Sequence, residues 1–365
     1  MRSITPELTE ELHNQIPDVK KIKSSTPVNV DTFRELVEHI AKLSYVNKDH
    51  MLFFRGQAND YVNKAGNSTF YPSIYRGDYV SHKELINRFD ILEGASRQLV
   101  KLFEEQRIDG YKDLKRRKYI QWSILQHYEV CATPLLDFTH SLRVACSFAT
   151  NDNVADHAYI FVFGLPYITN RISINSEHDL VNVRLLSICP PRALRPHFQE
   201  GYLVGTDDVT TGYETKTELD FHNRLIIKFK IPNTTSFWGT GFSNIPKESL
   251  YPDNDIIQDL CSQIKDLADK ELKSGELGDF LKAWSQLEDY INNIALNFSK
   301  RYLPLRESIK ILEVNYVIPS DLFREIDNIR KFRNILVHTP IKVKNNDIVK
   351  HLNQVNDLLN FLRNK

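Results

Sequence analysis

The stretch Gln121–Thr150 reads QWSILQHYEVCATPLLDFTHSLRVACSFAT and predicts two short helices joined by a turn-rich segment. Ile120, Ile124 and His127 recur at the spacing of one helix face. Pro134 then favours an extended backbone, because its ring fixes φ and restricts the residue before it. The first two-thirds of the chain is expected to fold around this helix, turn and extended segment.

A polar cluster follows a brief apolar strand inside this stretch. Leu135–Leu136 predicts the strand, and Asp137, Thr139 and His140 come directly after it. Ser141 is a typical cap for the helix that follows. Two interpretations stay open here: the polar side chains form a ligand site, or they accept hydrogen bonds from turn amides.

The chain before this stretch predicts two helices and a strand. The apolar stripe of Asp31–Leu43 predicts a helix, and Ser81 with Glu84 forms a capping-box pattern that opens a helix to about Gln106. Met51–Phe54 is a short apolar run that ends in Arg55, which favours a buried strand with a charged side chain at its end. Residues 1–27 are polar and predict irregular structure with at most one short helix.

The chain after this stretch first predicts strands and then only helices. Strand-like runs occur at Tyr159–Phe163, Arg184–Cys189 and Leu225–Ile231, whereas helical periodicity runs from about Ile256 to the end. The predicted fold class is therefore α+β, with a mixed domain followed by an all-α helical bundle. The expected parts are an N-terminal extension at 1–29, a mixed domain at 30–260 and a helical domain at 261–365.

Composition narrows the class of protein. The chain has 365 residues, with 47 basic and 47 acidic side chains, so no net charge attracts a polyanion. The densest basic run, Lys115–Lys118, is typical of a solvated surface, with nucleic-acid contact as the alternative. The four cysteines stand singly, which predicts neither a metal site nor a disulfide framework. A polar N-terminus and the lack of a long apolar run predict a cytoplasmic protein without a membrane span.

The mixed domain resembles the FRG family, whose Phe-Arg-Gly motif stands here as Phe54-Arg55-Gly56-Gln57. Further motifs follow in the family's order: Pro72-Ser73 with Arg76, Gln126-His127-Tyr128, Pro134-Leu135-Leu136-Asp137-Phe138-Thr139, Ala145 with Phe148-Ala149, and Gln199-x-Gly201-Tyr202. Two positions depart from the pattern, with Glu129 in place of a Gly and Thr133-Pro134 in place of Thr-Arg.

The resemblance implies a fold like that of ADP-ribosyltransferases and a site for NAD or a related nucleotide. Arg55 would then bind phosphate or ribose oxygens, because a guanidinium matches anionic oxygens in pairs. The residues implied for nucleotide binding are Arg55, Gln57, Tyr128, Asp137, Thr139 and Ser141. No acid is assigned to glycosidic cleavage: Glu218, Glu248 and Asp253 are candidates by position only, and Asp137 is the best-placed acid in the motif. A buried ion pair between Arg55 and Asp137 is the structural alternative.

The helical domain resembles HEPN domains, through Arg333-Asn334-x3-His338 near the end of a helix. Asn334 and His338 share a helix face, but Arg333 lies about 140° away from His338. One chain therefore makes an incomplete site, and a twofold dimer through this domain would complete it, as the resemblance implies. Arg333, Asn334 and His338 are the implied catalytic residues of a ribonuclease that needs no metal and no cofactor.

Together the two resemblances predict an effector of toxin or phage-defence type. The main hypothesis joins a nucleotide-binding FRG domain to a HEPN ribonuclease, with RNA as substrate and a homodimer as the assembly. In the first alternative, the FRG domain transfers ADP-ribose from NAD and the bundle only dimerises. In the second, the protein is a non-catalytic sensor or scaffold. The resemblances also imply an antitoxin or a phage-derived protein as partner.

Overall fold

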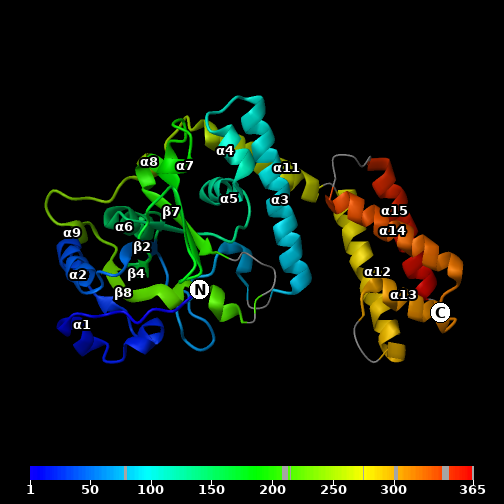
Figure 1. Ribbon diagram of the computed structural model, residues 1–365, viewed down its shortest axis with the longest axis horizontal. Helices are drawn as coiled ribbons and strands as arrows, with labels where there is room; N and C mark the ends of the chain where they lie inside the picture. The colour runs from blue at the N-terminus through cyan, green and yellow to red at the C-terminus, as the bar shows by residue number, and fades with distance from the viewer. Residues whose placement is uncertain are drawn as a thin grey trace. The chain divides into compact units, whose positions relative to one another are not determined.

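The structure is a computed structural model that describes residues 1–77, 80–207, 213, 215–273, 275–299, 303–338 and 345–363 (Figure 1). Within these ranges the side chains at 83, 266–277, 320, 337–338, 345–346 and 363 are not described. The chain divides into two compact units, Met1–Ile264 and Lys265–Lys365, and the division falls inside helix α11 (Ile256–Lys273). Each unit is described by itself below.

The first unit contains one mixed sheet, which in the described residues has eight strands in the order β1-β8-β4-β2-β3-β7-β6-β5. The strands are β1 (Val28–Asn29), β2 (Met51–Gln57), β3 (Leu136–Thr139), β4 (His157–Leu165), β5 (Ile172–Asn175), β6 (Leu180–Arg184), β7 (Gly201–Thr206) and β8 (Leu225–Pro232). β1 runs parallel to β8, and the other described pairs are antiparallel. The predicted α+β class is confirmed by this sheet and its helices.

Helices and short turns connect these strands. The α-helices of the first unit are α1 (Glu10–Gln15), α2 (Phe33–Val46), α3 (His82–Glu105), α4 (Tyr111–Arg116), α5 (Lys118–His127), α6 (Leu142–Thr150), α7 (Leu185–Ile188), α8 (Arg195–Gln199), α9 (Thr235–Trp238), α10 (Lys247–Leu250) and the start of α11. The 3-10 turns are η1 (Val19–Ser24), η2 (Ser73–Tyr75), η3 (Lys216–Leu219) and η4 (Phe221–Arg224). The predicted caps are confirmed, because Ser81 accepts the amide hydrogen of Glu84 and Ser141 that of Val144.

The glycine of the Phe-Arg-Gly motif lets helix α6 lie directly against strand β2. A Cβ atom added at Gly56 would stand 1.8 Å from the carbonyl oxygen of Ala145 and 3.0 Å from the Cβ of Ala149. Because a backbone oxygen cannot rotate away, this position excludes every side chain. The stretch that follows β3 is thereby fixed onto the face of β2 that carries Gly56.

Two apolar cores hold the first unit together. One gathers α2, α6 and the central strands around Phe53, Phe161 and Phe229. The other packs α3, α5 and the start of α11 against β6 and β7. In Figure 1, α2 and α9 lie at one end of the sheet and α3, α4 and α5 at the other. Residues 1–29, which were expected to form an extension, place Leu12 and Ile22 in the first core.

One predicted strand is wrong. Arg184–Cys189 was expected to be extended, but strand β6 ends at Arg184 and Leu185–Ile188 forms the short helix α7. Leu185 is buried while Leu186 is exposed, as expected for one helical turn at the surface of the core. A short apolar run cannot distinguish a strand from a buried helical turn, and here the true strand began earlier.

The second unit is a helical bundle with its own core. The rest of α11 leads into α12 (Gly275–Ser299), α13 (Leu305–Val314), α14 (Ser320–His338) and α15 (Asn345–Arg363). Its core includes Phe280, Leu287, Leu312, Ile326 and Val355. Helix α13 was not predicted, although Leu305, Ile309 and Leu312 show helical spacing and are buried. Phe298 and Ile335 fit the helical spacing of the apolar residues in their helices, but they are 46% and 52% exposed because the helices turn those positions outward.

The close approach at Gly56 gives the first prediction. Gly56→Ala should destabilise the first unit by at least the upper end of the ~1–3 kcal/mol typical of overpacking, because the clash is with backbone. Gly94→Ala is the matched control, since nothing lies within 4 Å of its added Cβ and it sits inside α3. That control should gain up to about 1 kcal/mol from helix propensity. Urea unfolding measures both, and equal stability of the two variants would contradict the packing described here.

Candidate functional site

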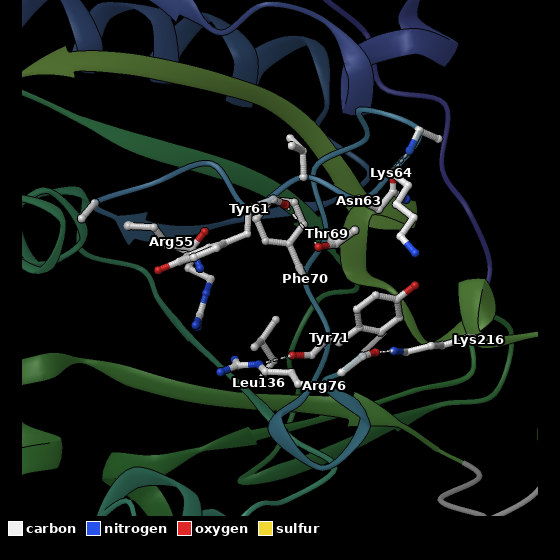
Figure 2. Close-up of a pocket in the computed structure, with 15 residues that line it drawn as sticks. Arg55, Tyr61, Asn63, Lys64, Thr69, Phe70, Tyr71, Arg76, Leu136 and Lys216 are labelled. Carbon is white, nitrogen blue, oxygen red and sulfur yellow. Dashed lines mark hydrogen bonds between the residues drawn. The ribbon is translucent and has the colours of Figure 1, made fainter. Parts of the chain in front are cut away.

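A pocket of about 940 Å³ opens beside the end of strand β2 (Figure 2). Arg55 and Gln57 enter it from the strand, and the loop 58–71 forms much of its wall. The remaining contributions come from Arg76 and Gly77 after η2, Leu136 on β3 and Lys216 on η3. The Arg of the Phe-Arg-Gly motif therefore lies where the sequence predicted a charged group at a strand end.

The described charged side chains that line this pocket are all cationic. Its described lining contains four cationic side chains, Arg55, Lys64, Arg76 and Lys216, and no carboxylate. Arg76 Nε donates to the Tyr71 carbonyl at 3.0 Å. Lys216 donates to the Gly77 carbonyl, and its Nζ lies 4.6 Å from the Tyr71 ring centroid. The contact of Arg76 is to a neutral carbonyl, so its charge, with that of Arg55, favours an anionic ligand.

Arg55 is the most enclosed of these cations. Its Nη1 donates to the backbone carbonyl of Asp137 at 2.6 Å, whereas its Nε has no hydrogen-bond partner within the described residues. Burial lowers the pKa of Arg55 to about 10, partly offset by the charge of Asp137. The guanidinium is still protonated at neutral pH, but it has lost much of its water. An anion that met its free N–H groups would replace that lost solvation.

Aromatic side chains add flat surfaces to the same pocket. Tyr61 is mostly exposed on the loop, while Phe70 packs against Phe161 with ring centroids 4.7 Å apart. Burial, and then the charge of Asp220, raise the pKa of Tyr71 above its ordinary range. Tyr71 therefore stays a neutral hydroxyl near the cations (Figure 2).

A buried ammonium fastens the loop that carries these groups. Lys228 on β8 donates to Asp60 at 2.9 Å and to Ser68 at 2.8 Å, so it ties both arms of the loop to the sheet. Asp220, also buried, accepts the amide hydrogen of Phe70 at 2.8 Å. Since both tethers are charge-assisted and buried, the pocket wall is held in place without a ligand.

The predicted nucleotide-binding residues do not all meet in this pocket. Phe54 pairs with Thr139 across the sheet, so these two side chains point to one face and Arg55 points to the other. Asp137 shares the face of Thr139, because it stands two residues before it. Strand alternation thus leaves Arg55 and Gln57 in the pocket and places the side chains of Asp137 and Thr139 on the opposite face.

The carboxylate of Asp137 belongs to a separate polar cluster on that opposite face. Gln126 Nε2 donates to it at 2.8 Å, and His127 Nδ1 lies 3.8 Å away. Burial raises the pKa of Asp137, but His127, Arg55 and Gln126 together bring it below its ordinary value. The side chain is 39% exposed, so a buried ion pair with Arg55 does not describe it. Arg55 contacts the carbonyl of this residue instead.

The other predicted residues of the set have structural partners. Tyr128 is buried and donates to Asp255 at 2.8 Å, and burial raises the pKa of Tyr128 far above its ordinary range. Thr139 donates to the Gln199 carbonyl at 3.0 Å, and Ser141 caps α6. The turn-amide interpretation of this stretch fits Thr139 and Ser141, because the amide of Ser141 also donates to Thr139 Oγ1.

Several residues of the pocket were not predicted. Arg76 was noted only as part of a motif, and Lys64, Tyr71 and Lys216 were not selected at all. A local signal existed for the loop, since polar and aromatic residues follow directly after the strand-end Arg55. Lys216 had no such signal, because only the folded chain brings it beside Tyr71.

The second unit carries part of the Arg-Asn-His motif within its described side chains. Arg333 Nη1 donates to Asn334 Oδ1 at 3.3 Å on helix α14, and both side chains are half-buried. Arg333 Nε has no partner within the described part of the chain. The side chain of His338 lies outside the described residues, so only its backbone, at the end of α14, is placed.

One family model matches part of the chain. Residues 50–158 match the family model of the FRG domain, which supports the FRG resemblance for this part of the chain. This match does not extend to the helical unit. No curated protein matches the chain, and no solved structure does. Among the described residues, no cluster of His, Cys, Asp or Glu could hold a metal ion, and no helix could span a membrane.

His140 gives a prediction of pH dependence next to this stretch. Its ring centroid lies 4.0 Å from Phe53 and 4.6 Å from Tyr202. Burial, and then the charge of Arg184, lower the pKa of His140 from 6.5 to about 4. His140 takes up a proton near pH 6.5 in the unfolded chain but only near pH 4 in the folded chain. Its contribution to the free energy of unfolding is therefore complete above pH 6.5 and is lost as the pH falls from 6.5 to about 4.

His140→Gln should therefore flatten the pH dependence of unfolding. Between pH 7 and pH 4, the wild type should lose on the order of 2–3 kcal/mol more of its unfolding free energy than the variant does. His50 and His178 also have lowered pKa values, but they titrate equally in both proteins. Urea titrations at the two pH values measure this difference, and parallel losses would show that His140 is solvated.

Proposed function

We propose that the first unit binds a phosphorylated nucleotide, of the NAD or ADP-ribose type, in the pocket at the end of β2. The observation that carries this proposal is the enclosed Arg55, with Arg76 in the same pocket, in a described lining that contains no carboxylate. Pyrophosphate oxygens suit these cations, and Arg55 is the one whose charge burial has left most poorly solvated. Tyr61 and Tyr71 would contact the rings of the ligand.

The same lining favours binding over ADP-ribosyl transfer. Cleavage of the glycosidic bond of NAD develops positive charge on the ribose, which a carboxylate stabilises. The acids considered from the sequence lie elsewhere: Glu218 closes a capping box with Thr215, and Asp137 faces the other side of the sheet. We therefore place nucleotide sensing in this unit and the chemistry in the helical unit.

As a second function, we propose that the helical unit is a ribonuclease of HEPN type that needs no metal. The observation in its favour is the half-buried Arg333, which is oriented by Asn334 and retains an unpartnered Nε among the described residues. Arg333 would neutralise charge on the phosphate, and His338 would move the proton of a ribose 2′-hydroxyl. A twofold dimer through this unit completes the site, and nucleotide binding by the first unit would control it in a toxin or defence effector.

Nucleotide binding predicts a specific loss in one variant. Arg55→Ala should weaken binding of ADP-ribose by about 1.5–3 kcal/mol, the scale of a hydrogen bond to a charged group. Arg55→Lys should recover only part of this loss, because an ammonium cannot bind two oxygens side by side. Isothermal titration calorimetry measures both.

Arg34→Ala is the control, since Arg34 lies on the exposed side of α2 and pairs with Glu38. It should bind like the wild type. No heat with NAD, ADP-ribose or ATP at millimolar concentration would end the nucleotide proposal. Equal losses of binding in Arg34→Ala and Arg55→Ala would show that only general charge attraction, and not this pocket, binds the nucleotide.

The ribonuclease proposal predicts cleavage of RNA but not of a matched DNA. The purified protein should cut labelled RNA in the presence of EDTA and leave a cyclic phosphate, because the 2′-hydroxyl is the nucleophile. Arg333→Ala and His338→Ala should each abolish cutting while the circular dichroism of the bundle stays unchanged.

Lys331→Ala is the matched control on the same helix, because Lys331 is exposed and pairs with Asp327. It should keep its activity. Cutting of DNA at the same rate, or loss of cutting with EDTA, would contradict this mechanism. Activity that elutes with a monomer would contradict the dimeric site.

A further inference from the structure

A second, smaller pocket lies at the β5 edge of the sheet and has a different character. Its volume is about 150 Å³, and strands β5, β6 and β7 form its floor. Ser173, Asn182 and Val204 stand in one row across these strands, so their side chains share a face. The segment before β5 closes the pocket with Pro166, Tyr167 and Thr169.

Asn182 is the unusual residue of this pocket. It is only 5% exposed, and neither its Oδ1 nor its Nδ2 has a hydrogen-bond partner within the described residues. A buried carboxamide without partners costs on the order of 1–3 kcal/mol, whereas an apolar side chain of the same shape would avoid that cost. The sequence therefore maintains a donor and an acceptor at the floor of a small cavity.

The rest of the lining limits what can meet this carboxamide. Leu180 and Val204 are buried and apolar, and Tyr167 presents a mostly exposed ring at the rim. Ser173 Oγ already accepts the amide hydrogens of Thr169 and Asn170, each at 3.1 Å. No Lys, Arg, Asp, Glu or His is among the described lining residues. The pocket suits a neutral ligand, in contrast to the cationic pocket beside β2.

We propose that this pocket binds a single neutral six-membered ring with an adjacent donor and acceptor, the chemical class of a pyrimidine base. The volume supports one ring, because an apolar cavity of about 150 Å³ is known to hold benzene. The carboxamide of Asn182 supports a ring with a donor and an acceptor side by side, because Asn pairs with nucleobases through one donor and one acceptor at once. Leu180 and Val204 would contact the face of the ring, and Tyr167 would cover its outer side.

Two methylated uracils test this assignment on the wild-type protein. 1-Methyluracil keeps the N3–H donor beside a carbonyl acceptor, whereas 1,3-dimethyluracil has no N–H donor on its ring. Saturation-transfer NMR and calorimetry should show binding of 1-methyluracil that is about tenfold or more tighter than that of 1,3-dimethyluracil, as expected for a paired edge. Equal binding of the two, or binding of neither, would overturn the proposal.

The variant Asn182→Leu separates a ligand site from a cavity that holds only water. If the carboxamide serves a ligand, the variant should melt at the same or a higher temperature than the free wild type and should lose 1-methyluracil binding. Asn292→Leu in the helical unit is the control, because Asn292 Oδ1 is also buried without a partner among the described residues, and it should bind like the wild type. A lower melting temperature for Asn182→Leu, with no effect of 1-methyluracil on the wild type, would show that ordered water alone satisfies Asn182 and that the proposal is wrong.

Discussion

The contact between Gly56 and the Ala145 carbonyl fixes how helix α6 packs on strand β2. It brings the backbone of helix α6 against strand β2, at a distance that leaves no room for a Cβ atom. Strand alternation then turns Arg55 away from the helix, and toward the loops that form the larger pocket. The glycine and the arginine of the motif therefore have linked roles, since one excludes a side chain where the helix packs and the other supplies a charge on the opposite face.

Local signals predicted the elements around this contact well. Ser81 and Ser141 cap the helices that they were expected to cap, and Arg55 lies at the end of a buried strand beside a pocket. These features depend on residues close in sequence, where capping and periodicity act. The separation of Asp137 from Arg55 was not predictable in this way, because it depends on the register of Phe54 with Thr139 across a long connection.

The same distinction applies to Glu129, one of the two departures from the family pattern. Glu129 stands where a Gly is usual, and its φ of 56° is in the left-handed region that favours glycine. Arg195 donates to the Glu129 carboxylate at 3.3 Å, an interaction that glycine could not make. The sequence alone showed that Glu129 replaces the usual Gly at this turn. The compensating partner, Arg195, became visible only when the fold brought α8 beside the end of α5.

The two faces of the sheet satisfy their polar groups from different elements. On the face of Gly56, which helix α6 covers, Asp137 pairs with Gln126 of α5 and Thr139 donates to the Gln199 carbonyl. Loops cover the face of Arg55 and Lys228, and they supply carbonyls and side chains that satisfy buried charge, as Asp60 does for Lys228. Asn182 and Leu136 both pair with Val204, so their side chains lie on the same face of the sheet. Leu136 lines the larger pocket and Asn182 the smaller one, so both proposed ligand sites use the loop-covered face. A rigid sheet with loops on one side can thus hold a cationic pocket and a neutral one on the same surface, because a different loop forms the wall of each pocket.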